Sequence, residues 1–423
     1  MAESGGYDHS RDRAEDLDAG DPLAVFQTRF VDAEPSLVYL DGNSLGRLPL
    51  TSVDRIIDVV TREWGTGLIR SWSHWIELAT VVGDEIAAGV LDARPGEVVV
   101  SDSTSVNLYK LAVAALDARP DRRVIVVDDD NFPTDNYVFQ GIATARGVEL
   151  RTVHSDIDAG PDLDELMAAI DQDVALVSMS QVAYRSGALI DMAAVTAAAH
   201  DTGALVLWDL SHSAGSVPVP LAETGADLAV GCTYKYLNGG PGAPAFIYVR
   251  RDLQAELRQP IWGWFGQTDQ FAMDADYRPS AGIERFTVGT PPVLGLTTVR
   301  EGVRLIAEAG IHRLRQKGMA LTDYAIELAD AWLPSFGFRL ASPRQAERRG
   351  AHLSLYHPQA WQICQALIDR GVVPDYRTPD RLRLGFAALT TSFADVWDAF
   401  DRIRTLVVDG RHVSYPAEPS RVT

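Results

Sequence analysis

Residues 205–242 read LVLWDLSHSAGSVPVPLAETGADLAVGCTYKYLNGGPG, and this stretch decides the fold. The runs Leu205–Trp208 and Leu228–Val230 are short and almost entirely apolar, and each gives way to polar residues. Runs without apolar–polar alternation are typical of strands buried on both faces, as in a parallel sheet covered by helices. The stretch therefore predicts two strands of such a sheet, with polar turns at their carboxyl ends.

The same pattern extends in both directions along the chain. Seven short apolar runs predict strands: Val98–Val100, Val124–Val127, Leu150–Val153, Ala175–Val177, Leu205–Trp208, Leu228–Val230 and Ala245–Val249. Segments with helical spacing lie between several of them: Val106–Leu116, Tyr137–Ala145, Leu163–Ile170 and Met192–Thr202. This alternation predicts an α/β fold, with a mostly parallel seven-stranded sheet flanked by helices.

Composition divides the chain into five parts. Residues 1–20 and 413–423 are predicted to be flexible tails, although the first could order on assembly. Residues 21–60 are assigned to an N-terminal segment. Residues 61–292 would form the large domain, and the longer amphipathic stretches of residues 293–412 predict a smaller α+β C-terminal domain.

Charge and cysteine content narrow the class of protein. The chain has 423 residues and a formal charge of −20, which repels nucleic acid and anionic membranes, so we expect neither as a partner. Cys232 and Cys364 are too few for a disulfide framework or a four-thiolate zinc site, and they fit a reducing compartment. No apolar signal segment or membrane-spanning run is visible. A cytoplasmic protein is therefore expected.

Polar residues follow the predicted strands at one edge of the sheet. In an open α/β sheet, ligands bind beyond the carboxyl ends of the strands. Five strand ends deliver chemically capable side chains to this edge: Thr104, Ser105, Phe132, Asp135, Ser180, Asp209, His212, Tyr234 and Lys235. Each has an ordinary structural explanation, but together they predict a ligand site.

The alternatives for individual residues stay open at this point. Ser105 could cap the following helix, which is compatible with a phosphate at the same helix N-terminus. Asp209 could cap a turn or face the protonated ring nitrogen of a pyridinium cofactor. Lys235 could be a loop lysine or a Schiff-base lysine. Phe132 could pack in the core or stack on a cofactor ring, and His212 could be a loop histidine or a ligand contact.

Competing chemistries lack their motifs. The sequence contains no phosphate loop ending in Gly-Lys-Ser/Thr, no dinucleotide glycine fingerprint after the first strand and no Gly-x-Ser-x-Gly elbow. Its nine histidines are scattered without metal-ligand spacing, so no metal site is predicted.

An Asp at one strand end, a Lys about two dozen positions later and earlier phosphate-holding hydroxyls resemble fold-type-I pyridoxal-phosphate (PLP) enzymes of the class-V aminotransferase-like superfamily. Within them, the chain most resembles the bacterial kynureninases. The similar segments span Tyr39 to Leu389: YLDGNSLGRLP, DSTSVNLYK, NFPTDNYV, SQVAYRSGALIDM, WDLSHSAGSVPV, GCTYKYLNGGPGAPAFIYV, GWFGQ, FTVGTPPVL and RLRLGFAAL. The segment around Lys235 and the GWFG element are specific to that family, whereas the Asp-x-x-His piece is shared with wider relatives.

The resemblance implies a role for each residue around the cofactor. Lys235 would bind PLP as a Schiff base and move the substrate α-proton, Asp209 would hold the pyridine nitrogen protonated, and Phe132 would stack on the ring. Tyr234 is the candidate for proton transfer at the leaving carbanion. The residues that would hold the phosphate or otherwise support the cofactor are Thr104, Ser105, Asp135, Ser180, His212 and Tyr234.

The resemblance also implies an assembly and a substrate side. Trp264 and Thr290 match positions that reach the phosphate from a neighbouring subunit, which implies a homodimer with shared active sites. Arg383 matches an arginine that clamps the substrate α-carboxylate. The resemblance places Asn43 and Ser44 in an N-terminal substrate loop, so that residues 21–60 would contribute to this loop and to the small domain.

The implied reaction is hydrolysis of L-kynurenine to anthranilate and L-alanine, a step of tryptophan catabolism. Gly289-Thr290 and Trp64 follow the bacterial pattern, which is associated with kynurenine rather than its 3-hydroxy form. A pocket without a partner for the ring hydroxyl should disfavour the hydroxylated substrate.

Three rival functions share parts of this pattern. A cysteine desulfurase or selenocysteine lyase would need a thiolate on a mobile loop, but Cys232 lies beside the predicted lysine strand and Cys364 lies in an apolar helical stretch. A transaminase would transfer the amino group to a keto acid. A non-catalytic PLP-binding regulator is opposed by the complete set of lysine, tyrosine and arginine, and by the lack of a basic nucleic-acid module.

Overall fold

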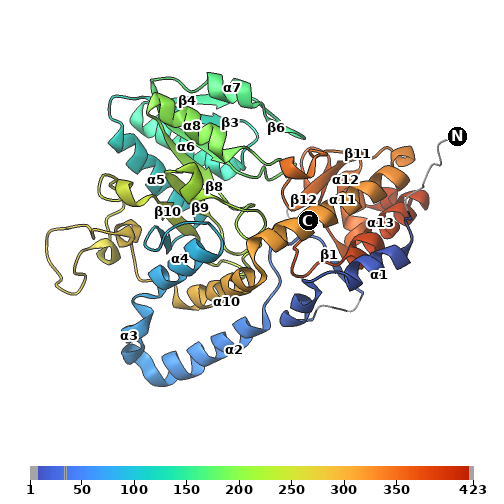
Figure 1. Ribbon diagram of the computed structural model, residues 1–423, viewed down its shortest axis with the longest axis horizontal. Helices are drawn as coiled ribbons and strands as arrows, with labels where there is room; N and C mark the ends of the chain where they lie inside the picture. The colour runs from blue at the N-terminus through green and yellow to red at the C-terminus, as the bar shows by residue number, and fades with distance from the viewer. Residues whose placement is uncertain (1–7, 33, 35, 419–423) are drawn as a thin grey trace.

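The computed structural model describes residues 8–32, 34 and 36–418, which form a large and a small part (Figure 1). The large part is built on a seven-stranded sheet in the order β2-β10-β9-β8-β7-β3-β4. Neighbouring strands run parallel, except that β10 is antiparallel to both β2 and β9. The strands are β2 (Val98–Val100), β3 (Val124–Asp128), β4 (Glu149–Val153), β7 (Val174–Ser180), β8 (Leu205–Asp209), β9 (Leu228–Gly231) and β10 (Phe246–Val249). The predicted fold class is confirmed.

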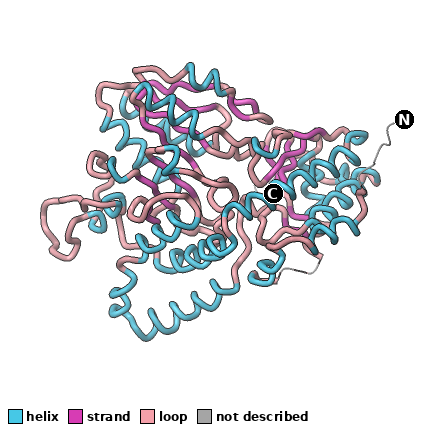
Figure 2. The backbone as a smooth tube through the Cα atoms, viewed as in Figure 1, coloured by secondary structure: helices cyan, strands magenta, loops and turns pink. Residues whose placement is uncertain are grey.

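Helices pack around this sheet and explain its apolar runs (Figure 2). Every residue of β2, β3, β8, β9 and β10 is buried, because neighbouring elements cover these strands. The helices of the large part are α4 (Leu78–Gly89), α5 (Thr104–Ala118), α6 (Pro133–Arg146), α7 (Leu163–Ala168), α8 (Met192–Thr202), α9 (Leu221–Thr224) and α10 (Val293–Ala309). The four helical segments that the sequence predicts correspond to α5, α6, α7 and α8.

The small part has its own sheet and its own core. Its four strands are antiparallel in the order β11-β12-β15-β14. They are β11 (Arg339–Leu340), β12 (His352–Tyr356), β14 (Asp375–Arg377) and β15 (Arg381–Gly385), with helices α11 (Ile311–Trp332), α12 (Ala360–Ile368) and α13 (Phe393–Val408). The N-terminal segment joins this part, since β1 (Val38–Tyr39) pairs in parallel with β13 (Val372–Val373).

Shorter elements complete the chain. A two-stranded hairpin consists of β5 (Ser155–Asp156) and β6 (Gly160–Pro161). The short 3-10 helices are η1 (Ala24–Arg29), η3 (Leu68–Ser71), η4 (Arg251–Leu253), η5 (Trp264–Gly266), η6 (Ile283–Phe286), η7 (Pro334–Phe336), η8 (Ala346–Arg348) and η9 (Arg411–Ser414). A helical arm, composed of α2 (Leu50–Asp58), the π-helix η2 (Val59–Gly67), η3 and α3 (Trp72–Trp75), extends along the lower edge of the molecule (Figure 1).

The prediction of a flexible N-terminal tail is wrong for its second half. Residues 11–19 form helix α1 (Arg11–Ala19), capped by the side chain of Ser10. Ala14 is fully buried in the small core, and the Asp18 carboxylate accepts hydrogen bonds from the backbone N–H groups of Phe393 and Ala394 at 2.7 and 2.9 Å. These contacts with α13 stabilise helix α1. The apolar pattern of residues 11–19 is too weak to predict that helix from the sequence. Residues 1–7 lie outside the described residues.

The C-terminal tail is likewise packed over its first residues. Tyr415 donates through Oη to Asp369 Oδ2 at 2.7 Å, and Gln362 donates to the backbone oxygen of Tyr415 at 2.7 Å. These contacts place the start of the predicted tail against α12 and the turn that follows it. Residues 419–423 lie outside the described residues.

The predicted boundary between residues 292 and 293 does not separate the two cores. The buried side chains of α10, among them Leu296, Val299 and Val303, belong to the larger core. The smaller core instead begins to collect side chains of α11 at Leu321. In the described ranges, no helix combines the length and the apolar character needed to cross a membrane.

Candidate active site

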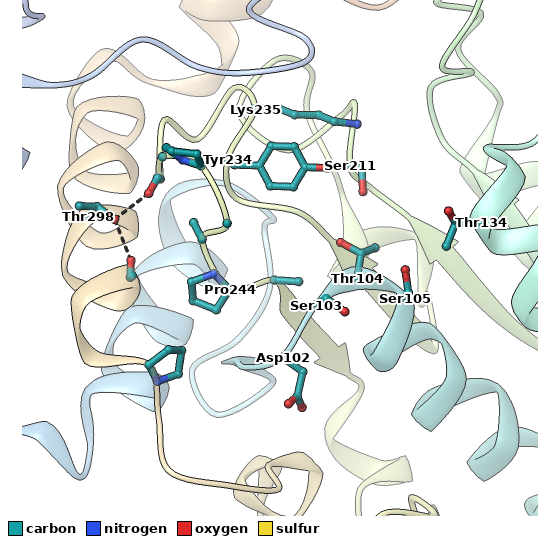
Figure 3. A pocket seen from close by; sticks show the side chains of 18 of the residues that line it. Asp102, Ser103, Thr104, Ser105, Thr134, Ser211, Tyr234, Lys235, Pro244 and Thr298 are labelled. Atoms are coloured by element: carbon teal, nitrogen blue, oxygen red, sulfur yellow. Dashed lines mark hydrogen bonds between the residues drawn. The ribbon is translucent and has the colours of Figure 1, made fainter. Parts of the chain in front are cut away.

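A cavity of about 860 Å3 opens at the carboxyl ends of the sheet strands, within the usual size range of small-molecule sites (Figure 3). The structure brings ten of the predicted site residues to its lining: Thr104, Ser105, Phe132, Asp135, Ser180, Asp209, His212, Tyr234, Lys235 and Thr290. They lie at or just beyond the carboxyl ends of β2, β3, β7, β8 and β9, and in the loop before α10. The prediction that these strand ends meet at one edge is confirmed.

Lys235 is the amine of this cavity. Its Nζ lies 2.9 Å from Nε2 of His212, and 6.0 and 5.9 Å from the ring centres of Phe132 and Tyr234. Burial first, and then the charge of Lys235, hold the pKa of His212 well below its usual value. His212 is therefore a neutral imidazole that can accept a hydrogen bond from Lys235.

The three lysines of the chain differ in their partners. Lys110 is fully buried and its Nζ lies 2.7 Å from Asp102, while Lys317 lies 2.6 Å from Asp21. Within the described residues, Lys235 has no carboxylate partner and contacts only neutral His212 through its amine. Its amine is thus the one that remains available for a ligand.

Two carboxyl groups lie close together in the cavity lining. Asp209 ends β8 and accepts from the backbone N–H of Ser211 at 2.7 Å. Burial first, and then the charge of Asp209, raise the pKa of Asp135 well above its usual value. Asp135 Oδ2 is buried and has no hydrogen-bond partner among the described residues. A cationic group placed here would offset the negative charge, so the residues fit the protonated ring nitrogen of a pyridinium cofactor.

The opposite side of the cavity is suited to an anion. Thr104 and Ser105 begin α5, across the cavity from Tyr234 and Lys235 (Figure 3). Ser103, rather than Ser105, caps the helix, because its Oγ accepts from the backbone N–H of Val106. The hydroxyls of Thr104 and Ser105 and the first N–H groups of α5 can therefore receive a phosphate.

Sequence reasoning missed several residues of the lining. Tyr184 meets the ring of Phe132 edge-on, with 5.5 Å between ring centres. Its position in SQVAYRSG, directly after β7, could have indicated it. Thr298 of α10 also lines the cavity, and its Oγ1 donates to the backbone oxygen of Gly239 at 2.6 Å. Nothing in the pattern of an amphipathic helix marks that threonine.

The predicted substrate residues form a second cluster beside the cavity. Arg383 in β15 is buried, and its Nη1 donates to the backbone oxygen of Tyr184. Its Nη2 donates to Ser44 Oγ at 3.0 Å. With its amide oxygen facing the guanidinium, Asn43 accepts from Arg383 Nε at 2.9 Å. These three residues come together, one residue away from the cavity lining.

Three further predicted residues lie away from the cavity of their own chain. Trp64 lies on η2 of the helical arm and is 57% exposed, and Trp264 lies in η5 and is 40% exposed. Gly289 borders a smaller cavity next to the main one, together with Thr290. Thr290 itself also lines the main cavity of its own chain.

Replacement of Gly46 by alanine should disturb the loop that holds Lys235. Gly46 donates its N–H to the backbone oxygen of Tyr234 at 2.8 Å, and a Cβ at this position would lie 2.2 Å from the backbone oxygen of Lys235. The backbone around Lys235 would have to move to make room for this Cβ. We therefore expect Gly46→Ala to lower the free energy of unfolding by about 1–3 kcal/mol, as measured by urea denaturation.

Gly141→Ala is the matched control for this experiment. Gly141 lies inside α6 with open space around its Cβ position, so alanine should stabilise the chain by about 0.5–1 kcal/mol. Equal effects of the two substitutions would contradict the tight packing at Gly46.

Comparison with known proteins places the chain in a family. A kynureninase of Pseudomonas fluorescens is 47% identical over 391 residues, which cover 90% of this chain and 92% of that protein. This chain belongs to the kynureninase family. A family model described as the kynureninase C-terminal domain also matches residues 314–403.

Solved structures of other proteins share the fold of this kynureninase family member. A cysteine desulfurase of Thermococcus onnurineus superposes with a TM-score of 0.78 at 20% identity, covering 93% of this chain and 98% of that one. A variant of the cystine lyase C-DES, with glycine covalently linked to its PLP cofactor, gives a TM-score of 0.77 at 17% identity, covering 88% of this chain and 97% of that one. At such low identities the likeness shows the shared fold alone.

Proposed function

We propose that this chain is a PLP-dependent hydrolase that converts L-kynurenine and water to anthranilate and L-alanine. The observation that carries the proposal is that one cavity holds both Lys235, the one lysine without a carboxylate partner in the described residues, and the neighbouring carboxyls of Asp135 and Asp209. Membership of the kynureninase family supports the substrate and the reaction.

The cavity residues divide into those that would hold each part of PLP. Lys235 would bind the aldehyde carbon, and Phe132 offers an exposed aromatic face beside it. Asp209, supported by Asp135, would hold the ring nitrogen protonated. Thr104 and Ser105 would receive the phosphate at the N-terminus of α5. PLP supplies an electron sink that stabilises negative charge on the substrate carbons next to its amine.

Two residues of the chain are suited to move protons during the reaction. The Lys235 amine would be the base for the substrate α-proton. Burial raises the pKa of Tyr234, so its phenol stays protonated at neutral pH and can donate a proton to the β-carbon that leaves. Water adds to the ketone carbon and the bond between the β- and γ-carbons breaks, so that the ring fragment leaves as a carboxylate.

A homodimer is part of the proposal. Exposed apolar side chains cluster on the helical arm and on the loop around η5: Ile57, Trp64, Leu68, Ile69, Trp262, Trp264, Phe271 and Met273. Apolar surface on this scale marks an interaction site in soluble proteins. A second copy of the chain covering it would bury Trp64 and Trp264.

Anthranilate formation tests the proposed function directly. We expect the PLP-loaded chain to convert L-kynurenine to a product with anthranilate fluorescence and to release one L-alanine for each anthranilate. If no anthranilate forms while PLP remains bound, the reaction is wrong even though the cofactor is right. Cysteine and keto-acid substrates would then be tested next.

The hydroxylated substrate should be turned over more slowly. Gly289 adds no side chain beside Thr290, and open space surrounds its Cβ position, so position 289 supplies no polar group to a ring hydroxyl. We expect kcat/KM for 3-hydroxykynurenine to be about 10-fold or more below that for L-kynurenine. A higher kcat/KM for the 3-hydroxy form would contradict this preference.

The burial of both cysteines argues against the desulfurase alternative. Cys232 and Cys364 are buried, and burial raises the pKa of each thiol. A desulfurase needs an accessible thiolate. Release of alanine from cysteine, abolished by substitution of one cysteine, would favour that alternative.

A further inference from the structure

A buried carboxylate faces Arg383 across the small sheet. Asp375 in β14 is the cross-strand partner of Arg383 in β15, and both side chains are 1% exposed. Arg383 Nε donates to Asp375 Oδ1 at 2.9 Å, and Arg383 Nη2 donates to Asp375 Oδ2. The strand register thus builds a two-point ion pair along one edge of the guanidinium.

The same carboxylate joins three parts of the chain. Ser44 Oγ donates to Asp375 Oδ2 at 2.9 Å, so the N-terminal loop is tied to the ion pair. Arg377 Nη2 also donates to Asp375 Oδ2, at 2.8 Å. The remaining end of Arg383, Nη1, donates to the backbone of Tyr184, which lines the cavity. Asp375 therefore holds the far edge of Arg383 while the opposite end lies at the cavity wall.

The charge of this cluster favours an anion. Two guanidinium groups, Arg377 and Arg383, share the single carboxylate of Asp375. Burial first, and then the charge of Asp375, raise the pKa of the neighbouring Asp41 to about 7, so Asp41 is largely uncharged on the acid side of neutrality. The cluster then keeps one positive charge that Asp375 does not neutralise.

We propose that Asp375 is a positioning residue for the substrate α-carboxylate: it holds the Arg383 guanidinium in the orientation that binds this group. The inference rests on the proposed function, because it takes Arg383 as the carboxylate-binding residue. Orientation before binding matters, since a free arginine side chain would lose rotamer freedom on contact with the substrate. Asp375 itself does not line the cavity.

Asp375→Asn tests this role with three ligands. The amide keeps the size of the side chain but removes its charge and one acceptor. We expect KM for L-kynurenine to rise about 10- to 100-fold, with kcat changed less than about threefold. Inhibition by L-alanine should weaken in parallel, because alanine carries the same α-carboxylate. Inhibition by 2-aminoacetophenone, which has the ring and ketone but no carboxylate, should stay unchanged.

Asp158→Asn is the matched control. Asp158 pairs with Arg381, another buried arginine of β15, with Arg381 Nε donating to Asp158 Oδ1 at 2.8 Å. Asp158 lies outside the cavity lining. Its substitution should lower the thermal unfolding midpoint without changing KM or the two inhibition constants.

The outcomes separate the inference from the proposed function. Unchanged KM in Asp375→Asn, or equal weakening of all three ligands, would overturn the positioning role. Should the asparagine variant not fold, Asp375→Glu serves instead: it keeps the charge but shifts the carboxylate, and should give the same pattern with a smaller rise in KM. Absence of anthranilate from the unaltered chain would refute the proposed function itself.

Discussion

Lys235→Ala is expected to reduce anthranilate formation by about 10⁵-fold or more, the largest effect of any single substitution in this chain. Alanine removes both the amine that would bind the PLP aldehyde and the base for the substrate α-proton. The other two lysines cannot replace it, since Lys110 and Lys317 are buried and each is ion-paired with a carboxylate. Anthranilate fluorescence measures the loss.

A second measurement does not depend on activity. Borohydride reduction of the PLP-loaded chain, followed by digestion and mass spectrometry, should place the cofactor on the peptide that contains Lys235. In Lys235→Ala no lysine peptide should carry it. Attachment to Lys110 or Lys317, or activity that survives the substitution, would show that the assignment of Lys235 is wrong.

Asp209→Asn is expected to lower kcat by roughly 10²- to 10³-fold while PLP stays bound. Removal of one partner from a buried charge pair costs about 3–5 kcal/mol, and each 1.4 kcal/mol on the barrier is about tenfold in rate. Without the carboxylate, the ring nitrogen would lose its proton and PLP would be a weaker electron sink. Steady-state kinetics, with cofactor content measured by absorbance, separates this loss of rate from loss of PLP.

Asp128→Asn is the matched control for Asp209→Asn. Asp128 is the last residue of strand β3, just as Asp209 is the last residue of β8, but Asp128 does not line the main cavity. Burial first, and then the charge of Asp129, raise the pKa of Asp128 to about 7, so near neutrality much of it is already uncharged, like asparagine. We expect kcat within about threefold of the unaltered chain. A similar loss of kcat in both variants would mean that the loss of any buried carboxyl group at a strand end, rather than of the contact with the ring nitrogen, explains the effect.

The main cavity could be predicted from the sequence because many of its residues lie near the ends of strands, and short stretches of sequence are enough to recognise those strands. The residues that the sequence pointed to, from Thr104 to Lys235, lie at or within a few residues of the end of an apolar run that is typical of a buried strand. Once parallel strands are inferred, their carboxyl ends must share one edge, so residues far apart in sequence meet without any knowledge of packing. The segments that match kynureninases suggested the roles that are proposed for these residues.

The rest depends on contacts between segments that no local pattern encodes. Helix α1 forms because Asp18 meets the N-terminus of α13, almost the whole chain away. Trp64 matches the family pattern, yet it lies on the exposed helical arm and not in the cavity of its own chain. A sequence match alone therefore does not locate a residue relative to the cavity.

The sequence by itself determined the order of strands and helices, the edge at which the polar turns meet, and the identity of Lys235 and Asp209 as the residues to test. These follow from the alternation of apolar runs and polar turns along the chain. Only the tertiary structure decided that Asp135 shares the burial of Asp209, that Asp375 holds Arg383, and that α10 belongs to the large core. The physical reason is that the charge state of a buried group, and the partner of a buried arginine, depend on what packs around them.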